Sequence, residues 1–537
     1  MGTIRNPVLA GFHPDPSFCR VGDDVFIATS TFEWYPGVLI YRSRDLVSWE
    51  LVARPLDRAS LLDMRGNPDG CGIWAPCLSH DGERFYLVYT DMKRNDGAFR
   101  DAHNYITSAA HIDGPWCEPW YINSSGFDPS LFHDADGRKY VLNLQWNHRG
   151  RGTGANPRHT GFDGLLLQGW SPEGGLTGPV SNIWPGTARG LTEAPHLFRR
   201  NGYYYLTTAE GGTDYGHAVT MARARDIRGP YETHPHSHLM STADAPAHPL
   251  QRVGHGQYIE LADGSAYHTF LMSRPVPGAD GTGRFSILGR ESGIERCVWG
   301  ADDWLYLEKG GLLPRESVPV PWETPPPASG AVTYAFGGDT LPADFQWLRT
   351  PCPQRLFRIG DGALTLFGRE SLGAWFEQAL VARRQQHFLY EAEVTLDFAP
   401  DTYQQGAGLI AYYNRQKFHA AIVSHDPELG RSISIISCLA DHPDGALTIT
   451  PKPPLPLGEG PVDLRVGVDH HSLRFAARTG GGAWMPVGPV LDATILSDEA
   501  GRGMHKSFTG AFVGMVAFDM TGQGREARFS RFSYRPG

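Results

Sequence analysis

The chain has 537 residues and a net charge of −10, with 41% hydrophobic and 20% charged residues, a composition typical of globular proteins. This length is too great for one ordinary hydrophobic core and predicts two domains, or three. With 58 acidic against 48 basic residues, the surface argues against a nucleic-acid partner and suits a neutral substrate. No stretch approaches the roughly 20 apolar residues of a membrane helix. Residues 1–16 lack the apolar core of a secretion signal, so we expect a cytoplasmic protein with no membrane partner.

One pattern repeats five times before residue 315: a short apolar segment, a turn containing glycine, and a run of aromatic and β-branched residues. Several turns contain Asp-Gly or Asn-Gly, the strongest local signal for a β-hairpin, because these residues tolerate a positive φ. A further strand follows later in each unit. The turn glycines are 55 to 65 residues apart and are Gly22, Gly82, Gly137, Gly202 and Gly264. Repeats of three or four antiparallel strands at this period predict a five-bladed β-propeller.

The composition changes after the fifth repeat. Six prolines lie between Pro314 and Pro327 and predict a stiff, extended connector. Beyond them, apolar and polar residues alternate strictly from Phe388 to Phe398, which is typical of a strand with one buried face. The chain is therefore expected to be all-β, with a five-bladed propeller at 1–315, a proline-rich linker at 316–330 and a concanavalin-like or jelly-roll β-sandwich at 331–537.

Each propeller repeat opens with a short segment that carries a chemically useful side chain. Because the first strand of every blade lines the central axis, equivalent positions in different blades face one another across it. The five side chains are Asp15, Trp74, Asp128, Glu193 and His255. A single Asp-Pro is more often a turn in which the carboxylate caps the bend. An acid in three of five repeats favours catalysis, because a structural turn would not need these acids at some repeats and Trp or His at others.

Three converging carboxylates indicate hydrolysis of a glycosidic bond. One carboxylic acid protonates the leaving oxygen, while one carboxylate activates water or attacks carbon. Crowding of like charges raises the pKa of one acid and keeps it protonated near neutral pH. Hard metal ions could use the same oxygen atoms, but no Asp-rich loop with EF-hand spacing occurs.

Seven short motifs, in this order along nearly the whole chain, resemble glycoside hydrolase family 43, and above all its β-xylosidase branch. The motifs are NPVLAGFHPDPSF, GIWAP, FDPSLF, GLTEAPHLF, RVGHGQY, LGRES and SFTGAFVGM. The resemblance implies that Asp15 is the general base that activates water and that Glu193 is the general acid on the leaving sugar. It implies that Asp128 tunes the pKa of Glu193 and holds its orientation. A base in place of a nucleophile implies inversion, with roughly 6.5–9.5 Å between the Asp15 and Glu193 carboxyl groups.

The resemblance also implies how the sugar is held. Arg290 would hydrogen-bond sugar hydroxyls and help keep Asp128 ionised. Phe508 would reach from the sandwich to close the pocket, which makes the enzyme exo-acting. The walls of the −1 and +1 subsites would be formed by Phe32, Trp74 and Trp146. Phe32 and Trp146, at strand ends, could equally belong to the propeller core.

His255 would lie near the axis, where some family members hold calcium or another divalent ion. A satisfied buried histidine is an equal reading, and no cofactor is required. Residues 147–161 form a Gly- and Arg-rich insertion near the pocket.

The expected activity is that of an inverting, exo-acting β-D-xylosidase that releases xylose from the non-reducing end of short xylooligosaccharides, with side activity on α-L-arabinofuranosides. An enzyme acting mainly on α-L-arabinofuranosides would use the same three acids. A non-catalytic carbohydrate-binding protein on a hydrolase scaffold would lack one of them, and all three are present. The resemblance further suggests a homo-oligomer, either a dimer or a tetramer.

Overall fold

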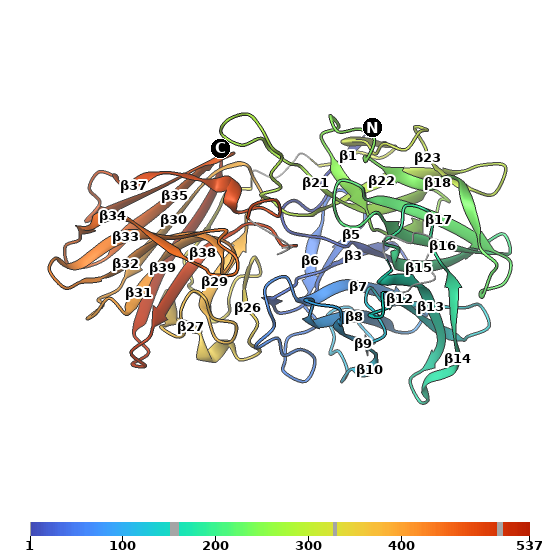
Figure 1. The fold of residues 1–537 in the computed structure, drawn as a ribbon, viewed down its shortest axis with the longest axis horizontal. Helices are drawn as coiled ribbons and strands as arrows, with labels where there is room; N and C mark the ends of the chain where they lie inside the picture. The colour runs from blue at the N-terminus through green and yellow to red at the C-terminus, as the bar shows by residue number, and fades with distance from the viewer. Residues whose placement is uncertain (1, 151–159, 326–329, 502–507) are drawn as a thin grey trace.

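The computed structural model describes residues 2–150, 160–325, 330–501 and 508–537. Two all-β bodies lie side by side, the N-terminal one coloured blue to green and the C-terminal one yellow to red (Figure 1). Within these residues the helical elements are two 3-10 turns, η1 (Pro353–Arg355) and η2 (Ala493–Ile495). Neither of these could cross a membrane, and the described residues hold no other helix. All seven cysteines lie in the described part as free thiols.

The N-terminal body is the predicted five-bladed propeller. The first strands of blades 1 to 4 contact one another in order, and the first strand of blade 5 contacts later strands of blade 4 and the first strand of blade 1, so the first strands surround the axis. In the described residues, each hairpin between the first and second strand contains the expected glycine, at a φ between 61° and 102° that favours a residue without Cβ. The strands of blades 1 to 3 are β2 (Ser17–Val21), β3 (Asp24–Thr29), β5 (Leu39–Ser43) and β6 (Glu50–Ala53); β7 (Gly72–His80), β8 (Phe85–Arg94), β9 (Asp101–Ala109) and β10 (Trp120–Asn123); and β11 (Ser130–His133), β12 (Lys139–Trp146), β13 (Phe162–Ser171) and β14 (Gly175–Trp184). Those of blades 4 and 5 are β15 (Glu193–Arg200), β16 (Tyr203–Glu210), β17 (Ala218–Ala224) and β18 (Glu232–Ser241); and β19 (Gln251–Gly254), β20 (Tyr258–Glu260), β21 (Ala266–Ser273), β22 (Glu291–Trp299) and β23 (Leu305–Leu307).

The start of the chain is tied to the segment that follows the fifth blade. Strand β1 (Gly2–Arg5) pairs antiparallel with β24 (Ser317–Val320), which lies inside the proline-rich stretch. The side chain of Asn6 adds hydrogen bonds to the carbonyl oxygens of Ile294 (2.9 Å) and Arg315 (2.8 Å). The β24 part of this stretch is therefore extended and held against the propeller.

The C-terminal body is a β-sandwich of two sheets, each eight-stranded within the described residues. In β30 (Leu389–Asp397) the expected alternation is seen, with Tyr390, Ala392, Val394 and Leu396 buried toward the opposite sheet. One sheet adds to β30 the strands β25 (Val332–Tyr334), β27 (Phe357–Gly360), β28 (Ala363–Phe367), β35 (Val462–Asp469), β36 (Ser472–Thr479), β37 (Met485–Asp492) and β39 (Glu526–Pro536). The other contains β26 (Phe345–Leu348), β29 (Ala379–Arg384), β31 (Gln405–Asn414), β32 (Lys417–Asp426), β33 (Gly430–Leu439), β34 (Leu447–Pro456) and β38 (Phe512–Asp519), with one further strand from the propeller. The predicted fold class is confirmed.

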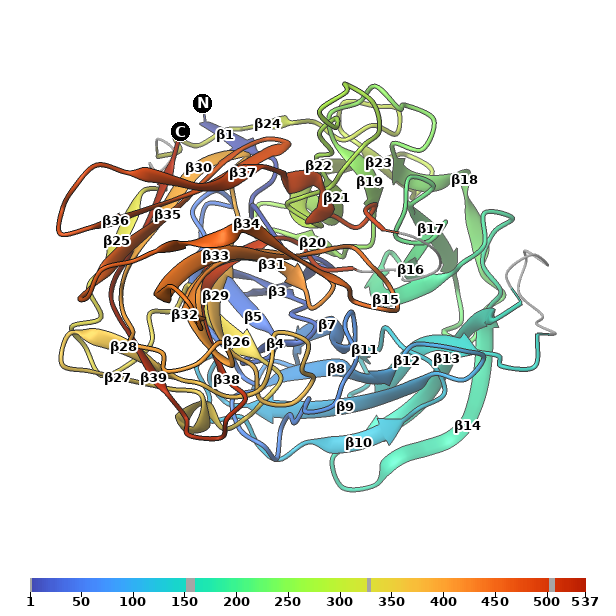
Figure 2. The ribbon, with the colours of Figure 1, turned by 60° about the vertical axis from the view of Figure 1, so that its left-hand side comes forward.

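That further strand, β4 (Trp34–Tyr35), joins the two bodies. It leaves blade 1 and pairs antiparallel with β26 of the sandwich, next to which it lies in Figure 2. The indole of Trp34 stacks on Phe512 with ring centroids 3.7 Å apart and planes at 15°. A shared sheet edge and a buried stacked pair fix the sandwich on the rim of the propeller, beside the end of the axis where the predicted site lies.

Candidate active site

Near the start of its first strand, every blade has a non-glycine residue with a left-handed backbone at a matching place in the repeat. Four of these five residues precede a proline, and strained positions of this kind cluster at functional sites. They are Asp15 (φ 58°), Ala75 (φ 38°), Asp128 (φ 55°), Ala194 (φ 53°) and His255 (φ 37°). When the five blades are aligned on this left-handed residue, Asp15, Asp128 and His255 occupy equivalent positions.

Trp74 and Glu193 come one residue before this position, so the five predicted residues are not strictly equivalent. In both blades the pairing register shifts just after the residue concerned, between Trp74 and Cys77 in β7 and between Glu193 and His196 in β15. Irregularities of this kind re-aim side chains and are frequent next to active sites. Despite the offset, the carboxyl of Glu193 acts electrostatically on Asp128, so the two acids lie close together.

Asp15 is held as a carboxylate. Ser30 Oγ donates a hydrogen bond of 2.6 Å to Oδ2, and Arg290 Nη1 donates one of 3.1 Å to Oδ1. His255 Nδ1 lies 3.5 Å from Oδ1. Burial raises the pKa of Asp15, but Arg290, His255 and Ser30 together outweigh burial and leave the pKa below its ordinary value. Ser30 Oγ also accepts a hydrogen bond of 2.7 Å from the backbone N–H of Ala75, which fixes the hydroxyl between blades 1 and 2.

Asp128 has the opposite electrostatic environment. Burial, then the negative charges of Glu193 and Asp15, raise the pKa of Asp128 well above its ordinary value. Ser130 Oγ, two residues further on, donates a hydrogen bond of 2.5 Å to the carbonyl oxygen of Pro195 and ties blade 3 to blade 4. Two coupled carboxyl groups in this setting retain one proton at a pH where separate carboxyls in water would both be ionised.

Arg290 pairs directly with one acid of the site and lowers the pKa of another. It lies just before β22 in blade 5, next to blade 1, and its direct ion pair is with Asp15, not Asp128. On Asp128 it acts only as a nearby positive charge. The same guanidinium donates hydrogen bonds to Thr213 Oγ1 (3.1 Å) and to the carbonyl oxygen of Phe508 (2.9 Å). Arg290 therefore joins the predicted base to the sandwich.

A continuous run of aromatic rings lies beside the acids. Ring centroids are 5.7 Å apart for Phe32 and Trp74, 5.5 Å for Trp74 and Phe127, and 6.2 Å for Phe127 and Trp146. The ring of Phe508 lies 6.2 Å from Trp74, so the sandwich contributes to this wall. Phe127 was not predicted, although it directly precedes Asp128 in the FDPSLF motif.

Both indoles of the wall are fixed by hydrogen bonds. Trp74 Nε1 donates to the carbonyl oxygen of Gly70 (3.0 Å), and Trp146 Nε1 donates to that of Ala98 (2.9 Å). The guanidinium of Arg100 lies 4.5 Å from the centroid of the Trp146 ring, a cation–π contact that the sequence analysis missed. Arg100 stands in a loop of a different blade, so no local pattern connected it with Trp146.

Sandwich residues near Phe508 are anchored on blade 5. The buried Arg252 pairs through Nη1 with Asp498 Oδ2 (2.5 Å) and through Nη2 with Glu499 Oε1 (2.6 Å). Glu499 Oε2 also accepts a hydrogen bond of 2.8 Å from the backbone N–H of Ser286. Arg290 lies close enough to act electrostatically on Asp498, and its bond to Phe508 completes the attachment.

His255 is buried beside Asp15. Its Nδ1 faces Asp15, and burial lowers the pKa of its imidazole. The neighbouring His196 and His217 have pKa values lowered to about 3, mainly by burial, so all three rings are neutral at physiological pH. Across residues 2–150, 160–325, 330–501 and 508–537, no group of three or more His, Cys, Asp or Glu side chains is arranged to hold a metal ion. The predicted insertion at 147–161 falls mostly outside the described residues.

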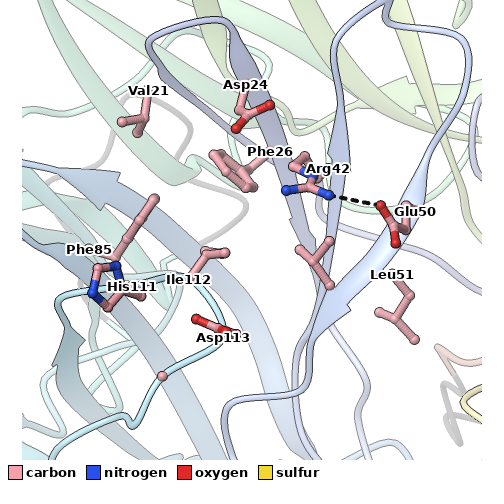
Figure 3. Close-up of a pocket in the computed structure, with 12 residues that line it drawn as sticks. Val21, Asp24, Phe26, Arg42, Glu50, Leu51, Phe85, His111, Ile112 and Asp113 are labelled. Carbon is pink, nitrogen blue, oxygen red and sulfur yellow. Dashed lines mark hydrogen bonds and ion pairs between the residues drawn. The ribbon is translucent and has the colours of Figure 1, made fainter.

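A separate hollow lies on the flank of the propeller, between blade 1 and the segment after β9 (Figure 3). Phe26 and Phe85 lie at its base, and the ion pair of Arg42 with Glu50 (3.0 Å) lies along one side. None of the predicted site residues lines it, so it is distinct from the acids at the axis.

Comparison with known proteins places this arrangement in a family. The model of glycosyl hydrolases family 43 matches residues 4–305. The chain belongs to glycoside hydrolase family 43. A second model, the β-xylosidase C-terminal concanavalin A-like domain, matches residues 333–535. The predicted family and enzyme class are confirmed: the chain is a glycoside hydrolase.

Relatives of this family 43 hydrolase match it over its full length. Xylosidase/arabinosidase 43B of Humicola insolens is 52% identical and is aligned over 100% of this chain and 98% of its own. A β-xylosidase of Bacillus subtilis is 43% identical over 99% of both chains. The crystal structure of a xylan β-1,4-xylosidase from Bacillus halodurans superimposes with a TM-score of 0.92 and 43% identity, over 99% of this chain and 100% of that one.

Proposed function

We propose that the protein is an inverting, exo-acting β-D-xylosidase that releases xylose from the non-reducing end of short xylooligosaccharides, with side activity on α-L-arabinofuranosides. The main support for this reaction is a contrast in protonation between the acids: Asp15 is held ionised, whereas the coupled pair of Asp128 and Glu193 retains a proton. An ionised base and a protonated acid are the two partners that inverting hydrolysis needs. The names of the relatives support xylosides as substrates.

In this mechanism the terminal sugar lies between Asp15 and Glu193. Asp15, oriented by Ser30 and Arg290, accepts a proton from the water that attacks the anomeric carbon. Glu193 donates a proton to the leaving oxygen, and the raised pKa of Asp128 reflects the crowding that keeps a proton available. Phe508 and Arg290 close the far side of the site, so only the end of a chain is accommodated.

The decisive experiment compares hydrolysis of an aryl β-D-xylopyranoside and an aryl α-L-arabinofuranoside by the purified protein, with Asp15→Ala as the blank. We expect faster turnover of the xyloside and none by the variant. Faster turnover of the arabinofuranoside would instead identify an α-L-arabinofuranosidase, the second candidate, which the name of the Humicola insolens relative favours. Proton NMR of aryl β-D-xylopyranoside hydrolysis, in which the only sugar released is the one cleaved at its anomeric carbon, checks inversion: α-xylose should appear first, and β-xylose first would indicate retention.

We further propose a cytoplasmic homo-oligomer, a dimer or tetramer. Seven free thiols suit a reducing compartment. The sheet-edge strands β34 and β37, which contact each other, expose the apolar side chains Leu447, Ile449, Met485 and Val490. Such a patch favours a contact between copies, with the proline-rich β34 limiting further strand pairing. Light scattering at micromolar concentration should give a multiple of the 59.1 kDa chain mass, and a monomer would exclude this part of the proposal.

A further inference from the structure

An exposed pair of stacked rings lies outside the site described above. Phe99 lies in the loop between β8 and β9 and is 57% exposed, one of the most exposed phenylalanines among the described residues. Its ring stacks on His148, with centroids 4.5 Å apart and planes at 24°. His148 is itself exposed and follows the end of β12. One face of the phenyl ring is thus supported by the imidazole, while much of the ring remains open to solvent.

This pair is attached to the aromatic wall from both sides. Ala98, before Phe99, accepts the hydrogen bond of Trp146 Nε1 (2.9 Å), and Arg100, after it, covers the Trp146 ring at 4.5 Å. Arg100 Nη1 also donates to the carbonyl oxygen of Phe99 at 3.3 Å. From the other chain segment, His148 lies two residues after Trp146. The stacked pair is therefore a continuation of the wall that passes through Trp146 and Phe127 to Asp128.

The chemistry of the pair suits a sugar ring. A xylopyranosyl residue has no hydroxymethyl group, so its faces are flat and largely C–H, and they pack well on an aromatic ring. The phenyl ring of Phe99 is uncharged, which matches an uncharged ligand. A single exposed aromatic residue needs no explanation. Phe99 differs from such a residue, because it lies at the outer end of the aromatic wall and His148 holds its ring in place before substrate binds.

We propose that Phe99, supported by His148, forms a platform for the xylosyl residue at the +2 subsite, beyond the two sugars bound at −1 and +1. This inference rests on the proposed xylosidase function and deepens it. The closed side of the pocket is formed by Phe508 and Arg290, so the reducing end of a longer oligosaccharide leaves past Trp146. The platform makes the enzyme favour xylotriose and longer chains over xylobiose.

The test compares Phe99→Ala with the wild type on an aryl xyloside, xylobiose, xylotriose and xylotetraose. We expect kcat/KM for xylotriose and xylotetraose to fall about three- to tenfold, mainly through KM, given the usual strength of aromatic stacking. The values for xylobiose and the aryl xyloside should not change. His148→Ala should show a weaker form of the same pattern, and Phe99→Tyr should retain wild-type preference.

The matched control is Tyr121→Ala, which removes an aromatic side chain of similar exposure (56%) from β10 of the same blade, away from Trp146. It should leave all four substrates unaffected. An equal loss on all substrates with Phe99→Ala, or no loss on xylotriose, would overturn the platform. If the wild type does not hydrolyse xylobiose, the proposed function fails. Calorimetry with Asp15→Ala then tests the platform separately: unchanged xylotetraose binding on adding Phe99→Ala would refute it.

Discussion

A substitution at Ser30 offers the sharpest test of how Asp15, the proposed base, is kept ionised. The Ser30 hydroxyl donates the shortest hydrogen bond to Asp15, at 2.6 Å, and contacts no other acid of the site. Ser30→Ala removes a hydrogen bond to a charged group, which contributes about 1.5–3 kcal/mol before water replaces part of it. Because 1.36 kcal/mol corresponds to one pKa unit, we expect the pKa of Asp15 to rise by about 1 unit. Arg290 and His255 remain in place, so the base still ionises near neutral pH.

The assay is the pH dependence of kcat/KM for an aryl xyloside, whose acidic limb reports the base of the free enzyme. The sign follows from the lowered pKa: weaker stabilisation of the carboxylate moves the acidic limb to higher pH, with little change in rate on the plateau. Ser130→Ala is the matched control, since Ser130 is an equally buried serine on β11 of blade 3 whose hydroxyl bonds the carbonyl oxygen of Pro195 and no carboxylate. An acidic limb that stays in place in Ser30→Ala, or that moves as far in Ser130→Ala, would refute the account.

Three further predictions concern the acid and the contribution of the sandwich. Glu193→Ala should slow xylobiose hydrolysis far more than hydrolysis of aryl xylosides with good leaving groups; an equal loss on both, measured by kcat, would contradict the acid role. Phe508→Ala should lower kcat/KM although it lies in the other domain, because it removes the ring beside Trp74; wild-type kinetics would show that the sandwich contributes nothing to the site. Glu499→Gln should lower kcat/KM less than Phe508→Ala does, because Arg252 keeps its close ion pair with Asp498 and the longer one with Asp214; a variant with normal kcat/KM but a lower melting temperature would make this anchor purely structural.

Much of the architecture could be predicted from the sequence because its signals are local. A hairpin turn needs a residue that accepts a positive φ, and the five glycines that meet this need mark the five blades directly. The alternation in β30 likewise follows from the period of a single strand. The repeat also made the position of the site predictable, because equivalent segments of a propeller meet at its axis. Asp15 and Asp128 occupy equivalent positions in their blades.

Only the tertiary structure decided the contacts between segments that are distant in sequence. The sequence around Arg290 does not indicate that its partner is Asp15, 275 residues away, since that choice depends on blade 5 closing against blade 1. The pairing of β4 with β26, and that of Arg252 with Asp498 and Glu499, depend on where the sandwich packs. The one-residue offset of Glu193 comes from a register shift, which changes which face a side chain occupies without leaving a sequence pattern. Residue types and local periodicity thus determined the blades and the acids, whereas the electrostatic partners that keep Asp15 ionised depend on long-range packing.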